Sequence, residues 1–186
     1  MIRQLPGTTV KADVQNADDV KTLLGNVFMA GGVVLSQVTA LTGLESYMVQ
    51  NWIQRRFLAP PVRKRYSADQ FCRIAMINAL RGVLQIEKIT TLISYVNGML
   101  DDDSDNILPD SLFYVYFVAS VSAAEERLAW TSDAAECVKA AVCDFEEPFE
   151  GAKDRLVTSL TAMVNACRAA EMLRAVDSTV DKILGK

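Results

Sequence analysis

Apolar residues recur at helical spacing along most of the chain, and glycine or proline separates most of the successive runs. Spacings of three and four residues place such side chains on one face of a helix. Short polar segments between the runs predict turns, and only one stretch reads as extended. The pattern therefore predicts a mainly helical protein, with helices near residues 18–30, 36–42, 44–55, 67–80, 84–97, 109–130, 132–145 and 151–184.

Several ends of these helices carry recognisable signals. Ser36 is placed to cap the second helix, and Gly43 separates it from the third. Ser67 and Gln70 have the spacing of a capping box, and Gly98 closes the helix that follows Gly82. Inner faces are predicted for three helices, at Met48, Val49 and Trp52, then Phe71, Ile74, Ile77 and Leu80, then Ile86, Ile89, Ile93 and Val96.

The last helix carries the longest apolar stripe. Its members advance by about 3.4 residues per step, close to the coiled-coil repeat of about 3.5. Packing within a bundle of the same chain and pairing with another subunit are both compatible with this repeat. The stripe consists of Leu156, Leu160, Met163, Cys167, Ala170, Leu173, Val176, Val180 and Ile183.

Charge divides the chain unevenly. The 186 residues, 51% of them apolar, suit one domain or two small ones and carry a net charge of -4. Between Val33 and Lys88 there are eight basic and three acidic residues, a net charge of +5, which leaves -9 for the remainder. A basic module between acidic flanks favours a polyanion-binding unit joined to a regulatory or oligomerising one.

Several other classes of protein find no support. The N-terminus lacks a secretory signal, and the uncharged span Thr22–Leu44 is too polar to cross a membrane, so a cytoplasmic protein is expected. With no histidine and no paired cysteines, we expect neither a metal nor another cofactor, and Cys72, Cys137, Cys143 and Cys167 are predicted to be buried. We find no nucleophile-base pair or phosphate loop, which argues against an enzyme.

An acidic segment, DDDSDN at residues 101–106, admits two interpretations. Asp101, Asp103 and Asp105 alternate like the first ligands of a calcium-binding loop. Asn106 and Leu112, however, occupy the positions where such a loop requires glycine and glutamate. An acidic linker that leads into a helix begun by Pro109-Asp110 is the favoured interpretation, and it marks a module boundary.

The most informative stretch is MVQNWIQRRFLAPPVRKRYS, residues 48–67. It gathers five basic residues within eleven positions, and a charge run of this kind is usually only a solvated face. The two short helices joined at Gly43 instead outline a helix-turn-helix, whose second helix enters a major groove. Pro60-Pro61 forbids further helix, and VRKRY predicts a short basic hairpin. Such a fold would bring two groups of basic residues to one phosphate-facing surface. The groups are Arg55 and Arg56 at the end of the second helix, and Arg63, Lys64 and Arg65 on the hairpin.

The order LSQVTALTGLESYMVQNWIQRRFLAPP, then RKRYS, then ADQFCRIAMINALRGVLQIEKITTLI resembles the winged-helix N-terminal domain of MerR-type transcriptional regulators. It is closer to a bacterial domain-of-unknown-function family of MerR-like proteins. The resemblance covers roughly residues 31–98 and, for the second family, extends to about residue 117. It implies a winged helix-turn-helix and DNA binding, and a dimer is expected because a few base contacts from one copy would give only weak selectivity.

Departures from the MerR pattern fall in the expected recognition helix and the turn after it. Gln50, Asn51 and Trp52 replace the usual Arg-Tyr-Tyr core; the two amides can read adenine edges but neutralise no phosphate. Arg56 replaces the usual turn glycine, so the turn adopts either a left-handed backbone or another shape. The wing lacks the Gly-Tyr-Arg tip, and Lys64 occupies the matching basic position.

These observations predict an N-terminal extension at residues 1–32, a winged helix-turn-helix at 33–100, and a helical bundle at 101–186 for dimerisation or effector binding. The expected function is a MerR-like, sequence-specific transcriptional regulator that binds double-stranded DNA as a homodimer, with room for an unidentified small-molecule effector. The alternative is a protein-interaction adaptor that keeps the helix-turn-helix without reading the groove. The expected DNA contacts are Ser46, Tyr47, Gln50, Asn51, Gln54, Arg55, Arg56, Arg63, Lys64, Arg65 and Tyr66.

Overall fold

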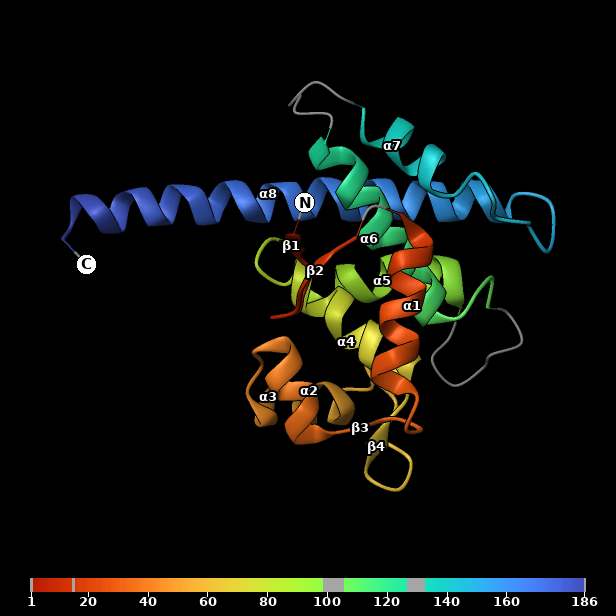
Figure 1. Cartoon of the computed structure of the whole chain (residues 1–186), viewed down its shortest axis with the longest axis horizontal. Helices are drawn as coiled ribbons and strands as arrows, with labels where there is room; N and C mark the ends of the chain where they lie inside the picture. The colour runs from red at the N-terminus through yellow and green to blue at the C-terminus, as the bar shows by residue number, and fades with distance from the viewer. Residues whose placement is uncertain (1, 15, 99–105, 127–132, 186) are drawn as a thin grey trace.

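Helices make up most of the computed structural model, which describes residues 2–14, 16–98, 106–126 and 133–185 (Figure 1). Two antiparallel strand pairs accompany them, β1 with β2 and β3 with β4. The mainly helical fold predicted from the pattern is confirmed. The elements of the described ranges are β1 Ile2–Gln4, β2 Lys11–Asp13, α1 Ala17–Phe28, β3 Val33–Val34, α2 Leu35–Thr42, α3 Ser46–Gln54, β4 Arg65–Tyr66, α4 Ala68–Leu80, α5 Ile86–Asn97, α6 Asp110–Glu126, α7 Ala134–Ala141 and α8 Ala152–Ile183.

Helix α6 is the centre of the core. Its side chains from Phe113 to Ser122 are buried on every side, as the apolar run predicted, and α1, α4, α7 and α8 pack around it. One apolar cluster continues from Leu5 in the N-terminal hairpin to Cys167 in α8. The three predicted segments therefore share a single core, and the boundaries at residues 32 and 100 stay predictions.

The N-terminal β1–β2 hairpin was not predicted. Its three-residue strands are too short to show an alternating pattern, and tertiary contacts hold the loop between them. Gly7 has φ of +71°, and a Cβ there would lie 1.8 Å from the carbonyl oxygen of Ala75 in α4. The side-chain amide of Asn78 also donates to the Gly7 carbonyl oxygen at 2.9 Å. The loop is thus fitted closely against α4.

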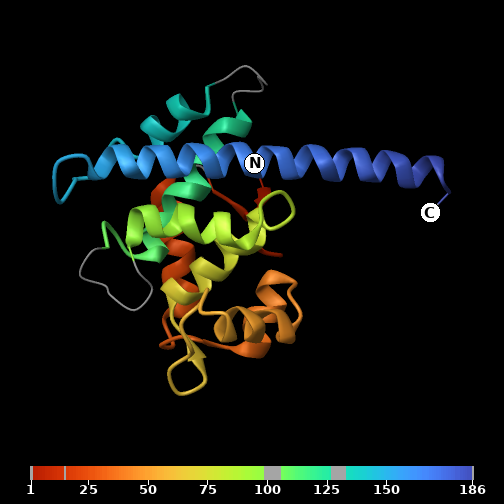
Figure 2. The same cartoon turned by 180° about the vertical axis from the view of Figure 1, so that it is seen from behind.

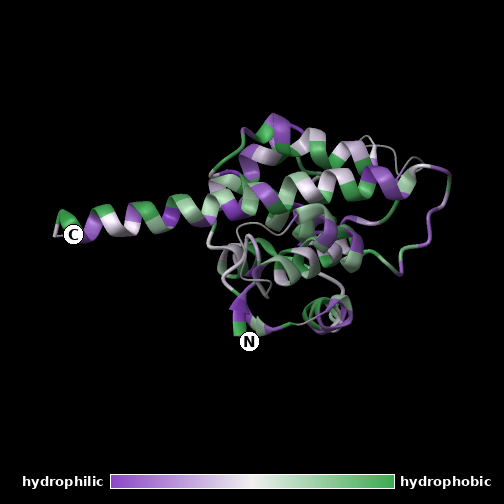
Figure 3. Ribbon diagram, turned by 90° about the horizontal axis from the view of Figure 1, so that it is seen from above, coloured by the Kyte–Doolittle hydropathy of each residue, from purple (hydrophilic) through white to green (hydrophobic). Residues whose placement is uncertain are grey.

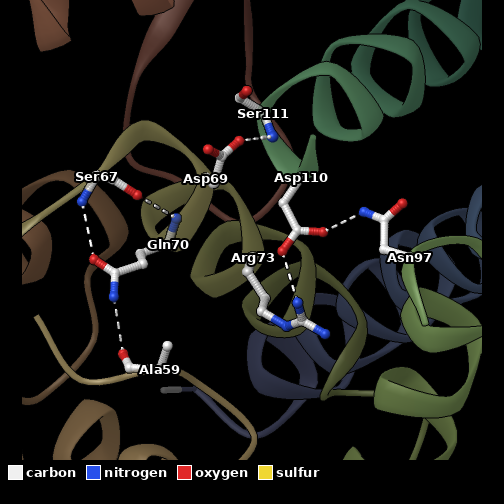
Figure 4. A network of polar contacts seen from close by, with 8 residues as sticks. All are labelled: Ala59, Ser67, Asp69, Gln70, Arg73, Asn97, Asp110 and Ser111. Atoms are coloured by element: carbon white, nitrogen blue, oxygen red, sulfur yellow. Dashed lines mark hydrogen bonds and ion pairs between the residues drawn. The ribbon is translucent and has the colours of Figure 1, made fainter. Parts of the chain in front are cut away.

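Helix α4 is tied to α5 and α6 by a buried polar network (Figure 4). The Arg73 guanidinium contacts a carboxylate oxygen of Asp110 at 2.7 Å, and the Asn97 amide donates to the other oxygen at 2.7 Å. At the start of α6, the backbone N–H of Ser111 donates to Asp69 at 2.9 Å. Since the Arg73 and Asp110 side chains are only 9% and 10% exposed, this ion pair is shielded from water.

Helix α8 extends well beyond the body of the protein (Figures 1 and 3). The first five members of the apolar stripe, from Leu156 to Ala170, are buried in the core. From residue 171 onward every described side chain of the helix is exposed. The last four members of the stripe are therefore uncovered: Leu173, Val176, Val180 and Ile183.

Most predicted helix signals are confirmed. Ser67 and Gln70 form the expected capping box, Gly98 ends α5, and Gly151 precedes α8. The Ser36 cap was wrong: α2 begins one residue earlier, and the Gln37 side chain instead accepts from the Val34 N–H at 3.0 Å.

Two predictions near α7 need correction, and others fall on residues that are not described. Helix α7 ends at Ala141, four residues earlier than expected, and Cys143 in the following turn is exposed whereas the other three cysteines are buried. Asp133 caps α7, while Ser132 lies outside the described residues. Most of the DDDSDN segment, including all three proposed calcium ligands, also lies outside them.

Candidate nucleic-acid interface

Helices α2 and α3 form a compact corner around Gly43. This glycine adopts a left-handed backbone, with φ of +70°, and its N–H donates to the Thr39 carbonyl oxygen at 2.8 Å. Val49 and Trp52 of α3 are buried, as predicted, and Met48 is half-buried. Packing on this inner side fixes which face of α3 meets solvent.

The outer face of α3 is free of covering elements in the described structure. The aromatic side chain of Tyr47 on this face is 67% exposed. The amides of Gln50 and Asn51 lie on the same exposed side and can donate and accept hydrogen bonds. All five α3 residues predicted to contact DNA are exposed: Ser46, Tyr47, Gln50, Asn51 and Gln54.

Arg56 holds a backbone conformation that favours glycine. It follows the end of α3 with φ of +59°. Its N–H donates to Ile53 at 3.0 Å, and the Phe57 N–H donates to Trp52 at 2.9 Å. These two bonds form a Schellman motif, in which the left-handed position is usually glycine. Of the two shapes left open for this turn, the left-handed one is observed.

The hairpin after the Pro60-Pro61 corner also has basic residues with positive φ. The backbones of Val62 and Arg65 bond to each other at 2.9 and 3.1 Å, which leaves Arg63 and Lys64 as the two turn residues. Both have positive φ, +50° and +64°, as in a type I′ turn, where Asn-Gly is preferred. In the described ranges, the non-glycine residues with positive φ are these two and Arg56, all of them basic.

Two of the five clustered cations already have partners within the protein. Arg55 contacts Glu87 of α5 at 2.7 Å and lies 4.6 Å from the centre of the Phe57 ring. Arg65 donates to the carbonyl oxygen of Gly32 at 2.8 Å. Among the described residues, Arg56, Arg63 and Lys64 form no ion pair, so their charges are available to an external anion.

Side chains beside the interface hold its parts in place. The Gln70 amide that completes the capping box also donates to the carbonyl oxygen of Ala59 at 3.0 Å (Figure 4). It donates to the carbonyl oxygen of Pro60 at 2.9 Å as well. The capping-box spacing revealed Gln70 but not this second role. Glu87 was missed as the partner of Arg55, because nothing in the pattern links residues 32 positions apart.

Tyr66 was expected to contact DNA, but its side chain is buried and only 3% exposed. The residue pairs with Val33 across the β3–β4 ladder, which turns its ring into the core. Tyr66 therefore anchors the hairpin instead of offering a contact. The other ten predicted contact residues are exposed.

Helix α3 and the hairpin tip lie at the same end of the molecule, away from α8 (Figures 1 and 2). Within the described ranges no three cysteine, aspartate or glutamate side chains come together as a metal site. In the same ranges, no helix is both long enough and apolar enough to cross a membrane. What this end offers is an exposed helix with amide side chains and, at the same end of the molecule, three cations that form no ion pair with the described residues.

Comparisons with known proteins give a family but no activity. An uncharacterised protein of Bacillus subtilis strain 168, YkrK, is 26% identical over 86 residues, which are 44% of this chain and 37% of the relative. The chain thus spans little more than a third of that relative's length. No solved structure matches the chain significantly. The model of a family described as a domain of unknown function, DUF1836, matches residues 18–117, more than half of the chain. The chain therefore belongs to the DUF1836 family.

Proposed function

We propose that this protein is a sequence-specific transcriptional regulator that binds double-stranded DNA through a MerR-like winged helix-turn-helix. The observation that carries the proposal is the backbone at Arg56, Arg63 and Lys64. A left-handed conformation costs about 1–2 kcal/mol at a residue with a side chain. Such strain concentrates at functional sites. Three strained basic residues at the same end of the molecule as an exposed helix suit a surface that holds phosphates.

Helix α3 is the proposed reading element. Its buried Val49 and Trp52 fix the helix, so that its outer face projects toward solvent. Gln50 and Asn51 can each make a bidentate contact with adenine in the major groove, worth about 1–3 kcal/mol of discrimination. Arg63 and Lys64 on the hairpin, the proposed wing, then supply affinity that does not depend on sequence.

A dimer is the second part of the proposal, because a few base contacts from one copy give weak selectivity. The exposed end of α8 offers the surface. Leu173, Val176, Val180 and Ile183 follow one another at spacings of three, four and three residues, the a and d positions of two heptads. Each is between 45% and 79% exposed, although apolar surface of this kind is usually covered. We propose that a second copy covers it.

The dimer can be tested with a charge placed on either face of α8. Val176→Asp puts a carboxylate in the proposed seam, and we expect light scattering to report a monomer. Ser178→Asp adds the same charge to the opposite face of the helix and should leave the dimer intact. A wild-type protein that is monomeric at tens of micromolar, or a Val176→Asp variant that still dimerises, would contradict this part of the proposal.

DNA binding is tested by selection from a random duplex pool, followed by fluorescence anisotropy at two salt concentrations. Arg63, Lys64 and Arg65 changed together to alanine should weaken binding to all sequences alike. The salt slope should fall by about 0.9 for each lost phosphate contact. Gln50→Ala or Asn51→Ala should instead change which sequence is enriched. Lys139→Ala, at the other end of the molecule on α7, is the matched control.

The same experiment decides against the proposal if no sequence is enriched and binding does not depend on salt. An adaptor that retains the helix-turn-helix for protein contacts would give that result. Such an adaptor would bind a protein partner in a fixed ratio, and no nucleic acid would remain bound to the complex. The variant with Arg63, Lys64 and Arg65 changed to alanine would still bind that partner.

A further inference from the structure

A pocket of about 570 Å³ lies where three segments meet, and we call it the junction pocket. Its walls are the Pro6–Thr9 loop between β1 and β2, the Asn78–Gly82 end of α4, and the Cys167–Asp177 part of α8. This volume falls within the range of small-molecule sites, about 300–1,000 Å³. The pocket is separate from the outer face of α3 and from the wing.

The floor of the junction pocket is preformed. The Asn78 amide donates to the carbonyl oxygens of Gly7 and Thr42, both at 2.9 Å. Thr9 donates through its N–H to Leu41 and through its hydroxyl to Ala40, both at 2.8 Å. These bonds hold the loop against α4 and the end of α2, so a ligand would need little rearrangement on entry.

Two arginines face the pocket with their terminal nitrogens available. The Nε of Arg81 donates to the Asn78 side-chain oxygen at 2.8 Å, and the Nε of Arg174 donates to the Ala170 carbonyl oxygen at 3.2 Å. These bonds orient both guanidinium groups. In the described structure neither arginine forms an ion pair, and a guanidinium fork matches a carboxylate in a bidentate contact.

Carboxylates lie on the same wall. Glu171 and Asp177 also line the pocket, three residues before and three residues after Arg174 on α8. No hydrogen bond or ion pair engages either one within the described ranges. A ligand with only negative groups would meet their repulsion, and a ligand with only positive groups would meet that of the two arginines.

We propose that the junction pocket binds a small zwitterion of the amino-acid or short-peptide class. Its carboxylate would pair with Arg174 and Arg81, and its ammonium group with Glu171 or Asp177. The buried apolar side chains of Leu5 and Cys167, which line the same pocket, would contact the ligand's own side chain. The proposal does not depend on DNA binding.

Isothermal titration of the full chain with the common amino acids and a panel of unblocked dipeptides tests this assignment. Each compound is paired with its N-acetylated amide, which has the same side chains without the charges. At least one unblocked compound should bind with a Kd below about 1 mM, and its blocked form at least about tenfold more weakly. DNA is absent from this experiment, so its outcome is distinct from that of the selection experiment.

Two variants locate the site. Arg174→Gln and the double variant Glu171→Gln with Asp177→Asn alter exposed side chains, so folding should be preserved, and each should weaken binding about tenfold or more. Arg155→Gln, on the same helix but outside the pocket, should bind as the wild type does. The assignment is overturned if no compound binds in this range, if blocked compounds bind equally well, or if both pocket variants retain wild-type affinity.

Discussion

Replacing Arg73 with alanine is expected to lower the free energy of unfolding by about 3–5 kcal/mol. The substitution leaves the Asp110 carboxylate buried between α4, α5 and α6, and among the described residues the Asn97 amide is then its one remaining side-chain partner. Removing one member of a buried pair is costly because the remaining charge cannot regain its hydration. Urea denaturation at pH 7, followed by far-ultraviolet circular dichroism, measures the loss.

The loss should become smaller as the pH falls. Burial raises the pKa of Asp110, and the Arg73 guanidinium and the Asn97 amide lower it without cancelling that effect. A carboxyl whose pKa is higher in the folded state binds its proton more readily there. Its contribution to stability therefore increases as pH falls through the folded pKa toward the unfolded value of about 3.9. Without Arg73 the folded pKa rises further, so the variant should recover stability on acidification.

Another ion pair of the same length provides the control. Arg55 and Glu87 are also 2.7 Å apart, but their side chains are 52% and 59% exposed. Arg55→Ala should therefore change the free energy of unfolding by less than about 1 kcal/mol. The double variant Arg73→Met with Asp110→Leu should be more stable than Arg73→Ala alone, since it leaves no buried charge. Equal losses for Arg55→Ala and Arg73→Ala would show that burial does not decide the effect.

Local rules predicted the helices well. The Ser67 capping box, the glycine after α5 and the long apolar run of α8 are signals contained within a few turns of helix, so the bounds of α4, α5 and α8 followed closely. The β1–β2 hairpin gave no such signal. Its loop is held by contacts with Ala75 and Asn78, about 70 residues away along the chain. A local pattern of apolar and polar residues does not indicate contacts at that separation.

In the candidate interface, the sequence predicted which side chains are exposed but not which of them have partners far away in the chain. The exposure of Gln50 and Asn51 followed from the helical period, once Val49 and Trp52 were taken as the inner side. The engagement of Arg55 by Glu87 and of Arg65 by Gly32 had no local cue. Tyr66 looked accessible because it follows three basic residues, yet its pairing with Val33 turns the ring into the core.

The apolar stripe of α8 shows a different limit. Its period suits both a bundle and a coiled coil, since the two differ little in residues per turn. Only the position at which the helix leaves the body separates the buried first part from the exposed second part. At that position the Cys167–Asp177 part of α8 meets the β1–β2 loop and the end of α4, which are distant from it in the sequence. The apolar pattern of α8 alone therefore does not predict where the helix leaves the body of the protein.

Removing the backbone strain at the proposed wing and turn should stabilise the protein and weaken DNA binding together. The variant combines Arg56→Gly, Arg63→Asn and Lys64→Gly, which are residue types that accept positive φ. Relief of about 1–2 kcal/mol per strained residue exceeds the entropic cost of glycine, about 0.5–1 kcal/mol. We expect the free energy of unfolding to rise by about 1–5 kcal/mol in total. The salt slope of DNA binding should fall by about 2.7 for each bound subunit, because each subunit loses three phosphate contacts.

A second variant separates strain from charge. Arg56→Gln, Arg63→Gln and Lys64→Gln together remove the same three charges but keep side chains at the strained positions. Its salt slope of DNA binding, measured by anisotropy, should decrease as much as that of the first variant. Its free energy of unfolding, measured by urea denaturation, should not rise. If the glycine-containing variant is no more stable than the glutamine variant, the positive φ values carry no strain. If the glutamine variant keeps the wild-type salt slope, these cations do not hold phosphates, and the strain at the three basic positions has a cause other than DNA.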